Sequence, residues 1–226
     1  MRKFLSVLLV CVSVTAYSQR YGDHRKVNIA FTVSPSASWL ASKESGIENG
    51  GGGFAFNYGF LTDVRFDDNY YFGTGLTIAH SRGKLDYPAG KGYNGDNPAS
   101  LPAATYSLRL QHVMIPLTLK LKTNEVGQKC IHYWGQFGTY LGINIGARLF
   151  DGGRNLDRER VTGSIQPVNA GLLLGAGAEI PLAGKTRLAL GLNFENGFVD
   201  VTRNSKWMSD GKMILNNLVL RTAVYF

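Results

Sequence analysis

Eight long segments of this chain alternate residue by residue between apolar side chains and small or polar ones, which restricts the possible folds strongly. They span about residues 26–40, 53–66, 70–81, 105–122, 131–149, 168–182, 186–198 and 213–226. A period of two residues is typical of a β-strand with two different faces. Strands of soluble proteins are usually about 5–6 residues long, whereas a tilted transmembrane strand needs about 9–11. The segments therefore predict an all-β protein with strands long enough to cross a bilayer.

One face of each segment is apolar, and the other carries glycine and polar or charged residues. In the segment 131–149 the apolar face holds Ile131, Tyr133, Phe137, Leu141, Ile143, Ile145 and Leu149. The opposite face holds His132, Gln136, Gly138, Gly142, Asn144, Gly146 and Arg148. The interior of a small barrel is narrow and favours small residues, whereas its outer face contacts lipid. We therefore expect the glycine-rich face to line a lumen.

The segment 105–122 changes phase part of the way along. Its second part places Ile115, Leu117, Leu119 and Leu121 on one face, whereas Tyr106, Leu108 and Leu110 have the opposite phase. An extra residue in one strand shifts its alternation by one position. We therefore predict a β-bulge near residues 112–114, and we place Arg109 on the polar face.

The connections between the segments alternate in length. The long ones span residues 41–52, 82–104, 150–167 and 199–212, and the shorter ones span 67–69, 123–130 and 183–185. Outer-membrane barrels have long external loops and short periplasmic turns. The pattern predicts an eight-stranded antiparallel up-and-down transmembrane β-barrel in the cell outer membrane, with both chain ends on the periplasmic side.

Residues 1–18 have the features of a secretory signal peptide, which leaves residues 19–226 as a single barrel domain. Arg2 and Lys3 precede an apolar stretch that is too short to span a bilayer, and small residues precede the cleavage site. The chain is therefore expected to be exported through this N-terminal signal.

The charge and the cysteine content exclude two further classes. The formal net charge is +8, and cleavage after residue 18 removes Arg2 and Lys3 and lowers it to +6. Because this charge is dispersed over an exported chain, we expect no binding to nucleic acid. Cys11 lies in the signal peptide, so Cys130 is left alone and no disulfide scaffold can form.

The end of the chain has the pattern of an assembly signal. Leu218, Leu220, Thr222, Val224 and Phe226 alternate up to a terminal aromatic residue. This pattern resembles the C-terminal signal that outer-membrane barrels present to the barrel assembly machinery. We therefore expect that machinery to be a partner through the strand ending at Phe226, and we expect a monomer.

Three short motifs resemble a known family. The stretch 112–122, HVMIPLTLKLK, resembles the fourth-strand signature of the PorT-like outer-membrane β-barrel family. GAGAEI at 175–180 and GLNF at 191–194 are similar to its sixth- and seventh-strand patterns. The resemblance implies an outer-membrane protein of a Gram-negative bacterium, in a family whose members mostly lack a known activity. One namesake assists protein secretion and gliding, but no motif here carries that role.

Charged residues on the inward face are expected to pair across the lumen. The proposed cluster sets Lys120, Arg187 and Arg221 against Glu179 and Glu195. Buried charges are tolerated when they are paired, so this cluster predicts a polar filling that stiffens the barrel. A proton or ion path is the alternative.

The external loops are the expected functional surface. The candidate interaction residues are Tyr87, Lys91, Tyr93, Arg154, Arg158, Arg160 and Trp207. Basic loops suit lipopolysaccharide and outer-membrane lipid, or an unknown surface or periplasmic protein with acidic groups.

The sequence predicts no enzyme, and no catalytic, cofactor-binding or metal-binding residues. His80 and Ser81 are adjacent in a strand and point to opposite faces, so they do not form a catalytic pair. Four function classes remain open. They are a structural or surface-interaction barrel, a narrow channel or secretion-accessory barrel, a lipid-modifying enzyme, and a soluble ligand-binding barrel.

Overall fold

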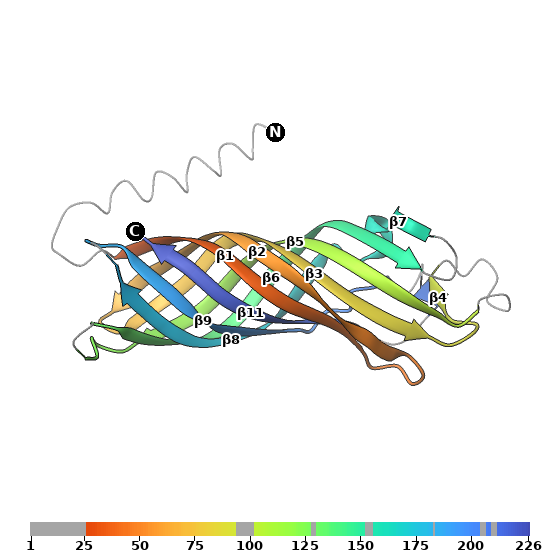
Figure 1. Cartoon of the computed structure of the whole chain (residues 1–226), viewed down its shortest axis with the longest axis horizontal. Helices are drawn as coiled ribbons and strands as arrows, with labels where there is room; N and C mark the ends of the chain where they lie inside the picture. The colour runs from red at the N-terminus through yellow and green to blue at the C-terminus, as the bar shows by residue number, and fades with distance from the viewer. Residues whose placement is uncertain are drawn as a thin grey trace, which may run out of the picture.

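A computed structural model of the protein describes residues 26–93, 102–127, 130–151, 156–182, 184–203, 207–208 and 212–226. Its barrel strands are β1 (Val27–Ser42), β2 (Glu48–Asp67), β3 (Tyr70–Tyr87), β5 (Ala104–Lys122), β6 (His132–Asp151), β8 (Val168–Pro181), β9 (Arg187–Gly197) and β11 (Met213–Tyr225). Each pairs antiparallel with its neighbours, and pairing of β5 with β6 closes the ring (Figure 1). The predicted eight-stranded antiparallel up-and-down barrel is confirmed.

Three short strands and one helical turn complete the described part of the fold. β4 (Gly92–Tyr93) pairs with β10 (Trp207–Met208), and β7 (Leu156–Arg160) pairs with the end of β6. The 3-10 helix η2 covers Thr162–Ser164. No helix in the described part of the chain is long and apolar enough to cross a membrane.

The two ends of the barrel differ. The short connections lie at the end where β1 begins and β11 finishes, which we call the turn end, on the left of Figure 1. The longer connections lie at the opposite end, which we call the loop end. The predicted signal peptide, residues 1–18, lies outside the described residues.

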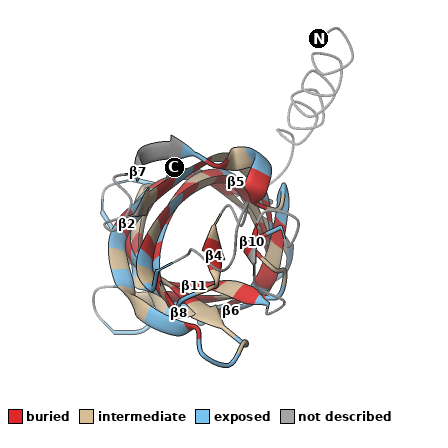
Figure 2. Ribbon diagram, turned by 90° about the vertical axis from the view of Figure 1, so that its right-hand side faces the viewer, coloured by how far each residue is buried: buried red, intermediate tan, exposed pale blue. Residues whose placement is uncertain are grey.

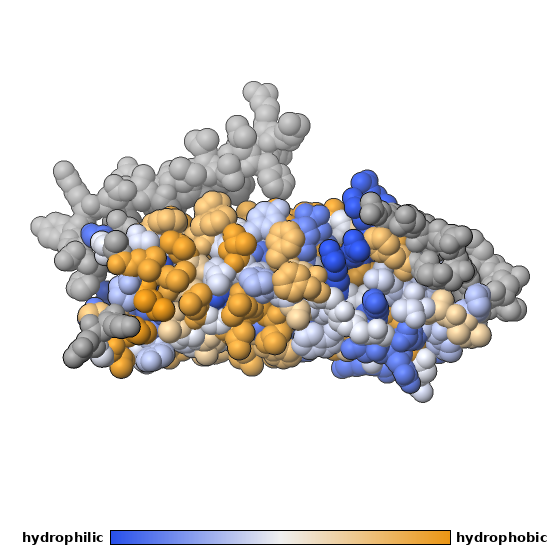
Figure 3. All heavy atoms as spheres, viewed as in Figure 1, coloured by the Kyte–Doolittle hydropathy of each residue, from blue (hydrophilic) through white to orange (hydrophobic). Residues whose placement is uncertain are grey.

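An apolar belt surrounds the turn-end part of the barrel. Its exposed members include Ile29, Phe31, Phe60, Phe72, Leu117, Phe137, Leu172, Leu192 and Leu220. Figure 3 shows this apolar surface over the left and middle of the barrel, with hydrophilic residues to the right. A large exposed apolar surface of this kind requires a non-aqueous environment.

The interior of the loop-end half holds an apolar cluster, which we call the plug. Barrel strands contribute Leu40, Leu85, Tyr87, Tyr106, Leu108, Leu110, Ala147, Leu149, Met213 and Leu215. The segments between strands contribute Ile47, Val161, Ile165 and Val201, and β10 contributes Trp207. The barrel therefore has an apolar outside at one end and an apolar inside at the other.

β5 passes through both environments without changing phase. Tyr106 and Leu108 are buried inside the loop end, and Lys120 is buried inside the turn end. On the outward face, Arg109 is exposed at the loop end and Leu117 at the turn end. The prediction that this strand changes phase at a bulge near residues 112–114 is therefore wrong, and so is the predicted lumen position of Arg109. The residues switch polarity because the surroundings switch, not because the strand slips.

A bulge does lie at this height, but its extra residue belongs to β6. The register between the strands shifts between Gln111 and His112, which leaves Ile145 of β6 as the additional residue. Beyond it, Arg148 is exposed and Leu149 is completely buried, the reverse of the prediction. A single inserted residue turns every later side chain to the other face.

Candidate functional site

Two lysines and two carboxylates form a compact charge cluster inside the turn-end half of the barrel. Lys120 Nζ lies 2.7 Å from Asp63 Oδ2 and 2.8 Å from Glu179 Oε1. Lys122 Nζ lies 2.9 Å from Glu179 Oε1 and 3.4 Å from Asp63 Oδ2. All four side chains are almost fully buried. Because burying an unpaired charge is unfavourable, the equal number of positive and negative groups stabilises the cluster.

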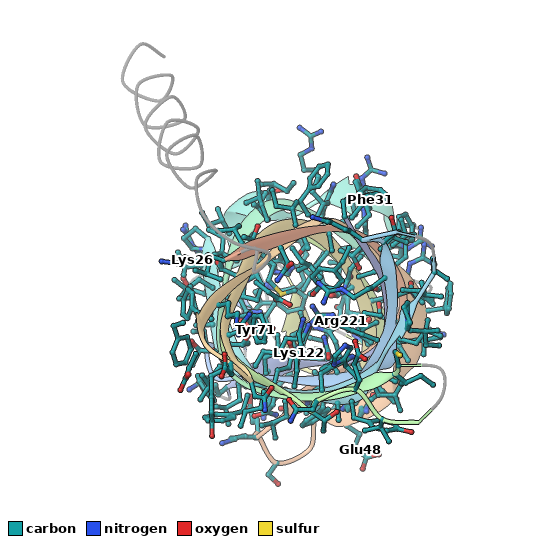
Figure 4. The ribbon with its side chains drawn as sticks, turned by 90° about the vertical axis from the view of Figure 1, so that its left-hand side faces the viewer. Lys26, Phe31, Glu48, Tyr71, Lys122 and Arg221 are labelled. Carbon is teal, nitrogen blue, oxygen red and sulfur yellow. The ribbon has the colours of Figure 1, made fainter. Side chains whose placement is uncertain are left out.

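Aromatic rings surround the two ammonium groups. Lys120 Nζ donates a hydrogen bond to the Tyr225 hydroxyl at 3.0 Å and lies 5.1 Å from the Trp134 ring centroid. Lys122 Nζ lies 4.4 Å from the Tyr71 ring centroid. Figure 4 shows Tyr71 and Lys122 pointing into the barrel from the turn end. These ring faces attract cations and exclude water from them.

Glycines make room for the Trp134 indole. A Cβ atom added at Gly177 or Gly191 would lie 2.7 or 2.5 Å from Cζ2 of that ring. Any larger residue at these two positions would displace the indole or the neighbouring backbone. The glycine-rich inward face thus saves space where the lumen holds a large side chain.

A second set of hydrogen bonds continues from the charge cluster toward the middle of the barrel. Arg221 donates to Gln136 Oε1 at 2.6 Å and to the Tyr225 hydroxyl at 3.0 Å. Gln136 Nε2 donates to Asn193 Oδ1 at 3.1 Å. These bonds join β11, β6 and β9 across the lumen, so they resist deformation of the barrel wall.

The other two residues of the expected cluster lie at its margin or away from it. Arg187 Nε is 3.9 Å from Glu179 Oε2, and its Nη2 donates to Asn28 Oδ1 at 3.1 Å. Glu195 instead accepts a hydrogen bond from Asn217 Nδ2 at 3.0 Å. No ion pair joins Glu195 to any described cation. The alternation placed Glu195 on the correct face but gave no information about its height.

Sequence reasoning missed Asp63 and Lys122. Both lie on the inward face of their strands, where a charged residue is unusual and needs a partner. Asp63 follows the inward phase of β2, so its position was a usable signal. Lys122 is the last residue of the predicted strand, and it has the same phase as Lys120.

A cavity of about 40 Å³ lies between the charge cluster and the plug. Its polar lining includes Asn57, Thr77, Asn193, Glu195 and Arg221. A water molecule needs roughly 10–15 Å³ of such volume, so the cavity has room for only a few waters. Asp63 of the charge cluster also lines this space.

Trp207 of β10 occupies the centre of the plug. Its ring centroid lies 5.2 Å from that of Tyr93, 5.9 Å from Tyr87 and 6.0 Å from Tyr106. Its Nε1 donates a hydrogen bond to the Ser164 carbonyl at 3.1 Å. Figure 2 shows β4 and β10 inside the ring of strands at the loop end. Segments from three different loops are thereby fixed to one another inside the barrel mouth.

The aromatic candidates for loop contacts therefore lie inside the protein. Tyr87 and Trp207 are each only 2% exposed, and Tyr93 is half-buried. Burial raises the pKa of the Tyr87 phenol well above its usual range. The expectation that these rings form an exposed contact surface needs correction. The strands extend far enough beyond the apolar belt to enclose a core of their own.

The basic candidates have different positions. Lys91 Nζ forms an ion pair with Glu44 Oε1 at 2.5 Å, and Arg160 is exposed. Arg154 lies outside the described residues, as does the side chain of Arg158. Of the predicted basic residues, Arg160 therefore has a defined and accessible position.

A family model with the description "Outer membrane protein beta-barrel domain" matches residues 17–203. No curated protein sequence matches the chain. The family match covers most of the chain and all but the last of the barrel strands.

Several solved outer-membrane barrels are similar in fold. Neisserial surface protein A is 13% identical, with 87% of this chain and 95% of that one covered and a TM-score of 0.48. OprG of Pseudomonas aeruginosa is 11% identical, with 88% of this chain and 94% of that one covered and a TM-score of 0.42. Ail of Yersinia pestis, solved with the heparin analogue sucrose octasulfate, is 11% identical, with 89% of this chain and 99% of that one covered and a TM-score of 0.40.

Proposed function

This chain belongs to the outer membrane protein β-barrel domain family, and we propose that it is a closed, non-conducting barrel presenting a rigid surface outside the cell. The outer membrane is its location, so the apolar belt contacts lipid. By the rule that outer-membrane barrels follow, the turn end faces the periplasm and the loop end faces outward.

The plug is the observation that carries this proposal. A conducting barrel needs a continuous wet path, whereas fifteen buried apolar residues fill the loop-end interior of this one. The charge cluster fills the lumen at the other end, with Lys120 and Glu179 completely buried. Together they support a structural role over the alternative of a narrow channel.

The length of the strands supports a role at the cell surface. β2 and β6 have 20 residues each, whereas a membrane crossing needs about 9–11. With a tilt of about 40°, the excess corresponds to roughly 25 Å of barrel wall outside the hydrocarbon. A projecting wall with its own core can hold loops in fixed positions against a partner. This is the reason to prefer a surface-interaction role to a lipid-modifying enzyme.

We also propose that the barrel is PorT-like and that it has no acyl-transfer site. The motif at 112–122 supports the PorT-like branch of the family, and Phe226 supports recognition by the barrel assembly machinery. His80 stacks on Phe56 with ring centroids 4.8 Å apart, whereas Ser81 donates inward to Asn217 Oδ1 at 3.1 Å. Because His80 and Ser81 lie on opposite faces of the strand, they support a protein without an acyl-transfer site.

Conductance tests the closed barrel directly. Purified full-length protein, folded into planar bilayers, should give no stable current steps under conditions in which a trimeric porin conducts. Reproducible steps whose ion selectivity changes in Glu195→Gln, a residue lining the central cavity, would instead establish an ion path.

Site-specific photocrosslinking in living cells tests the surface role. A photoreactive amino acid at Ser45 or Arg203, which are exposed at the loop end, should give adducts of defined mass. The same amino acid at Phe137 in the apolar belt is the matched control and should give none of those adducts. If neither loop position gives a specific adduct, a purely structural role is the better description.

A further inference from the structure

Four arginines lie side by side across four neighbouring strands. Arg82 of β3 pairs in register with Arg109 of β5, which pairs with Arg148 of β6. Arg148 in turn pairs with Arg160 of β7. All four are exposed. We call this set the arginine row.

The register places these side chains on one face and at one height. Residues directly opposite each other in antiparallel strands point to the same side of the sheet. Neighbouring strands are about 4.8 Å apart, so the row extends roughly 15 Å around the barrel wall. Four positive charges are therefore concentrated in a short arc that points away from the lumen.

The row brings four like charges together on one face of the sheet. Like charges placed directly opposite each other in a sheet destabilise it. The Arg109 guanidinium lies against the wall, 4.3 Å from the Phe150 ring centroid. Lys84 adds a further exposed cation beyond Arg82 on β3. An anionic ligand that lies across the strands could contact several of these exposed guanidinium groups at once.

The row lies directly beyond the apolar belt. On β5, Arg109 is 12 positions from Leu121, and on β3, Arg82 is 12 positions from Tyr70. A tilted strand crosses the hydrocarbon in about 9–11 residues, so both arginines lie at the level of the lipid headgroups. His80, stacked on Phe56, occupies the level between the belt and the row.

We propose that the arginine row binds the phosphate groups of a phosphorylated glycolipid in the outer leaflet. Guanidinium groups bind phosphate through two parallel N–H···O bonds, which an ammonium group does not reproduce. A headgroup with more than one phosphate suits a row that presents several guanidinium groups side by side. A lipid is a better candidate than a soluble polyanion, because the row lies at the level of the lipid headgroups, directly beyond the hydrocarbon.

This proposal does not depend on whether the barrel conducts, and it concerns the barrel wall instead of the loops. Further along the same strands, Asp86 accepts a hydrogen bond from Thr105 and pairs in register with Glu48. The wall therefore changes from basic to acidic with distance from the membrane. A phosphate would be attracted to the membrane-proximal level.

Binding is tested with full-length protein in nanodiscs of phosphatidylcholine, with or without a diphosphorylated glycolipid of the lipid A type. Native mass spectrometry counts the bound glycolipid, and titration gives its affinity. Arg109→Gln with Arg148→Gln should weaken binding at least about tenfold. The control with the same charge change, Lys43→Gln with Arg203→Gln, should change it less than about twofold, because both residues lie elsewhere at the loop end.

Two further arms distinguish the possible outcomes. Arg109→Lys with Arg148→Lys keeps the charge and should still lose affinity, because two-pronged contacts are lost. These exposed substitutions are checked for folding by heat-modifiable gel migration. The proposal is overturned if the dephosphorylated glycolipid binds equally well or if the control variant loses as much affinity. Equally tight, row-dependent binding of a soluble sulfated polysaccharide in detergent would overturn it in favour of a soluble polyanion.

Discussion

Neutralising Glu179 is the sharpest test of the charge cluster. Its carboxylate accepts hydrogen bonds from Lys120 at 2.8 Å and from Lys122 at 3.0 Å, and it is completely buried. Glu179→Gln keeps the shape and one acceptor oxygen but removes the negative charge. The remaining cluster then has two lysines and one carboxylate, Asp63, in a site that water reaches poorly.

The expected loss of stability follows from this imbalance. Removing one partner of a buried ion pair costs about 3–5 kcal/mol, because the other charge stays buried. Lys120 retains Asp63 at 2.7 Å, whereas Lys122 retains it only at 3.4 Å. We therefore expect the lower end of the range, about 3 kcal/mol, with most of the effect arising from Lys122.

The measurement is the free energy of unfolding in urea, with protein reversibly folded into detergent micelles or vesicles. The matched control is Glu195→Gln, a buried carboxylate without an ion pair to any described residue, and it should cost less than about 1 kcal/mol. Adding Lys122→Met to Glu179→Gln should recover part of the loss, with a coupling energy of at least about 1 kcal/mol.

Membrane conductance should stay unchanged in all of these variants, because the plug remains in place. If Glu179→Gln costs no more than Glu195→Gln, the cluster does not stabilise the barrel as argued. The same conclusion follows if adding Lys122→Met makes the loss purely additive.

Three further predictions concern the plug, the bulge and the orientation. Trp207→Ala should destabilise the loop end by about 3–5 kcal/mol and speed its cleavage by trypsin, whereas Trp207→Phe should have a smaller effect; equal cleavage rates would argue against the plug. Deleting Ile145 should remove the bulge and leave Arg148 outward and Leu149 inward, because Gly146 then follows Asn144 in regular register with Gln111. The heat-modifiable band should therefore persist, and its loss would contradict this register. Exposed Cys130 should react with a membrane-impermeant maleimide only after the outer membrane is permeabilised. Because a hydrogen bond with Glu125 raises the pKa of this thiol, labelling should accelerate with rising pH. Labelling of Cys130 in intact cells would mean that the turn end faces outward, the opposite of the proposed orientation.

The turn-end half of the barrel was predictable from the sequence because one rule holds along every strand. The outer face of each strand contacts lipid and the inner face lines a narrow lumen. Apolar residues such as Leu117 and Phe137 therefore identify the outer face, and polar residues such as Glu179 identify the inner face. The alternation of loop lengths then gave the connectivity and the positions of the two chain ends.

The loop-end half was not predictable in this way, because in water the same alternation places the apolar residues inside and the polar residues outside. Tyr106 was assigned to an outward phase and Arg109 to an inward one, because the strand was assumed to stay in the membrane. Likewise, Tyr87 and Trp207 were expected on the surface, because aromatic residues in polar loops resemble a contact site. A sequence pattern records which faces differ, but not where the solvent changes.

The sequence by itself thus determined the strand number, the antiparallel order, and which residues share a face in the turn-end half. Only the tertiary structure decided which of those residues meet, because height in a barrel depends on the register summed around the ring. Closing that ring brings Asp63 of β2 to Lys120 of β5, while it leaves Glu195 without an ion pair to the described residues. It also aligns arginines that lie 27, 39 and 12 positions apart along the chain into one row. Register depends on every intervening turn and bulge, and the single extra residue at Ile145 shows how little is needed to change it.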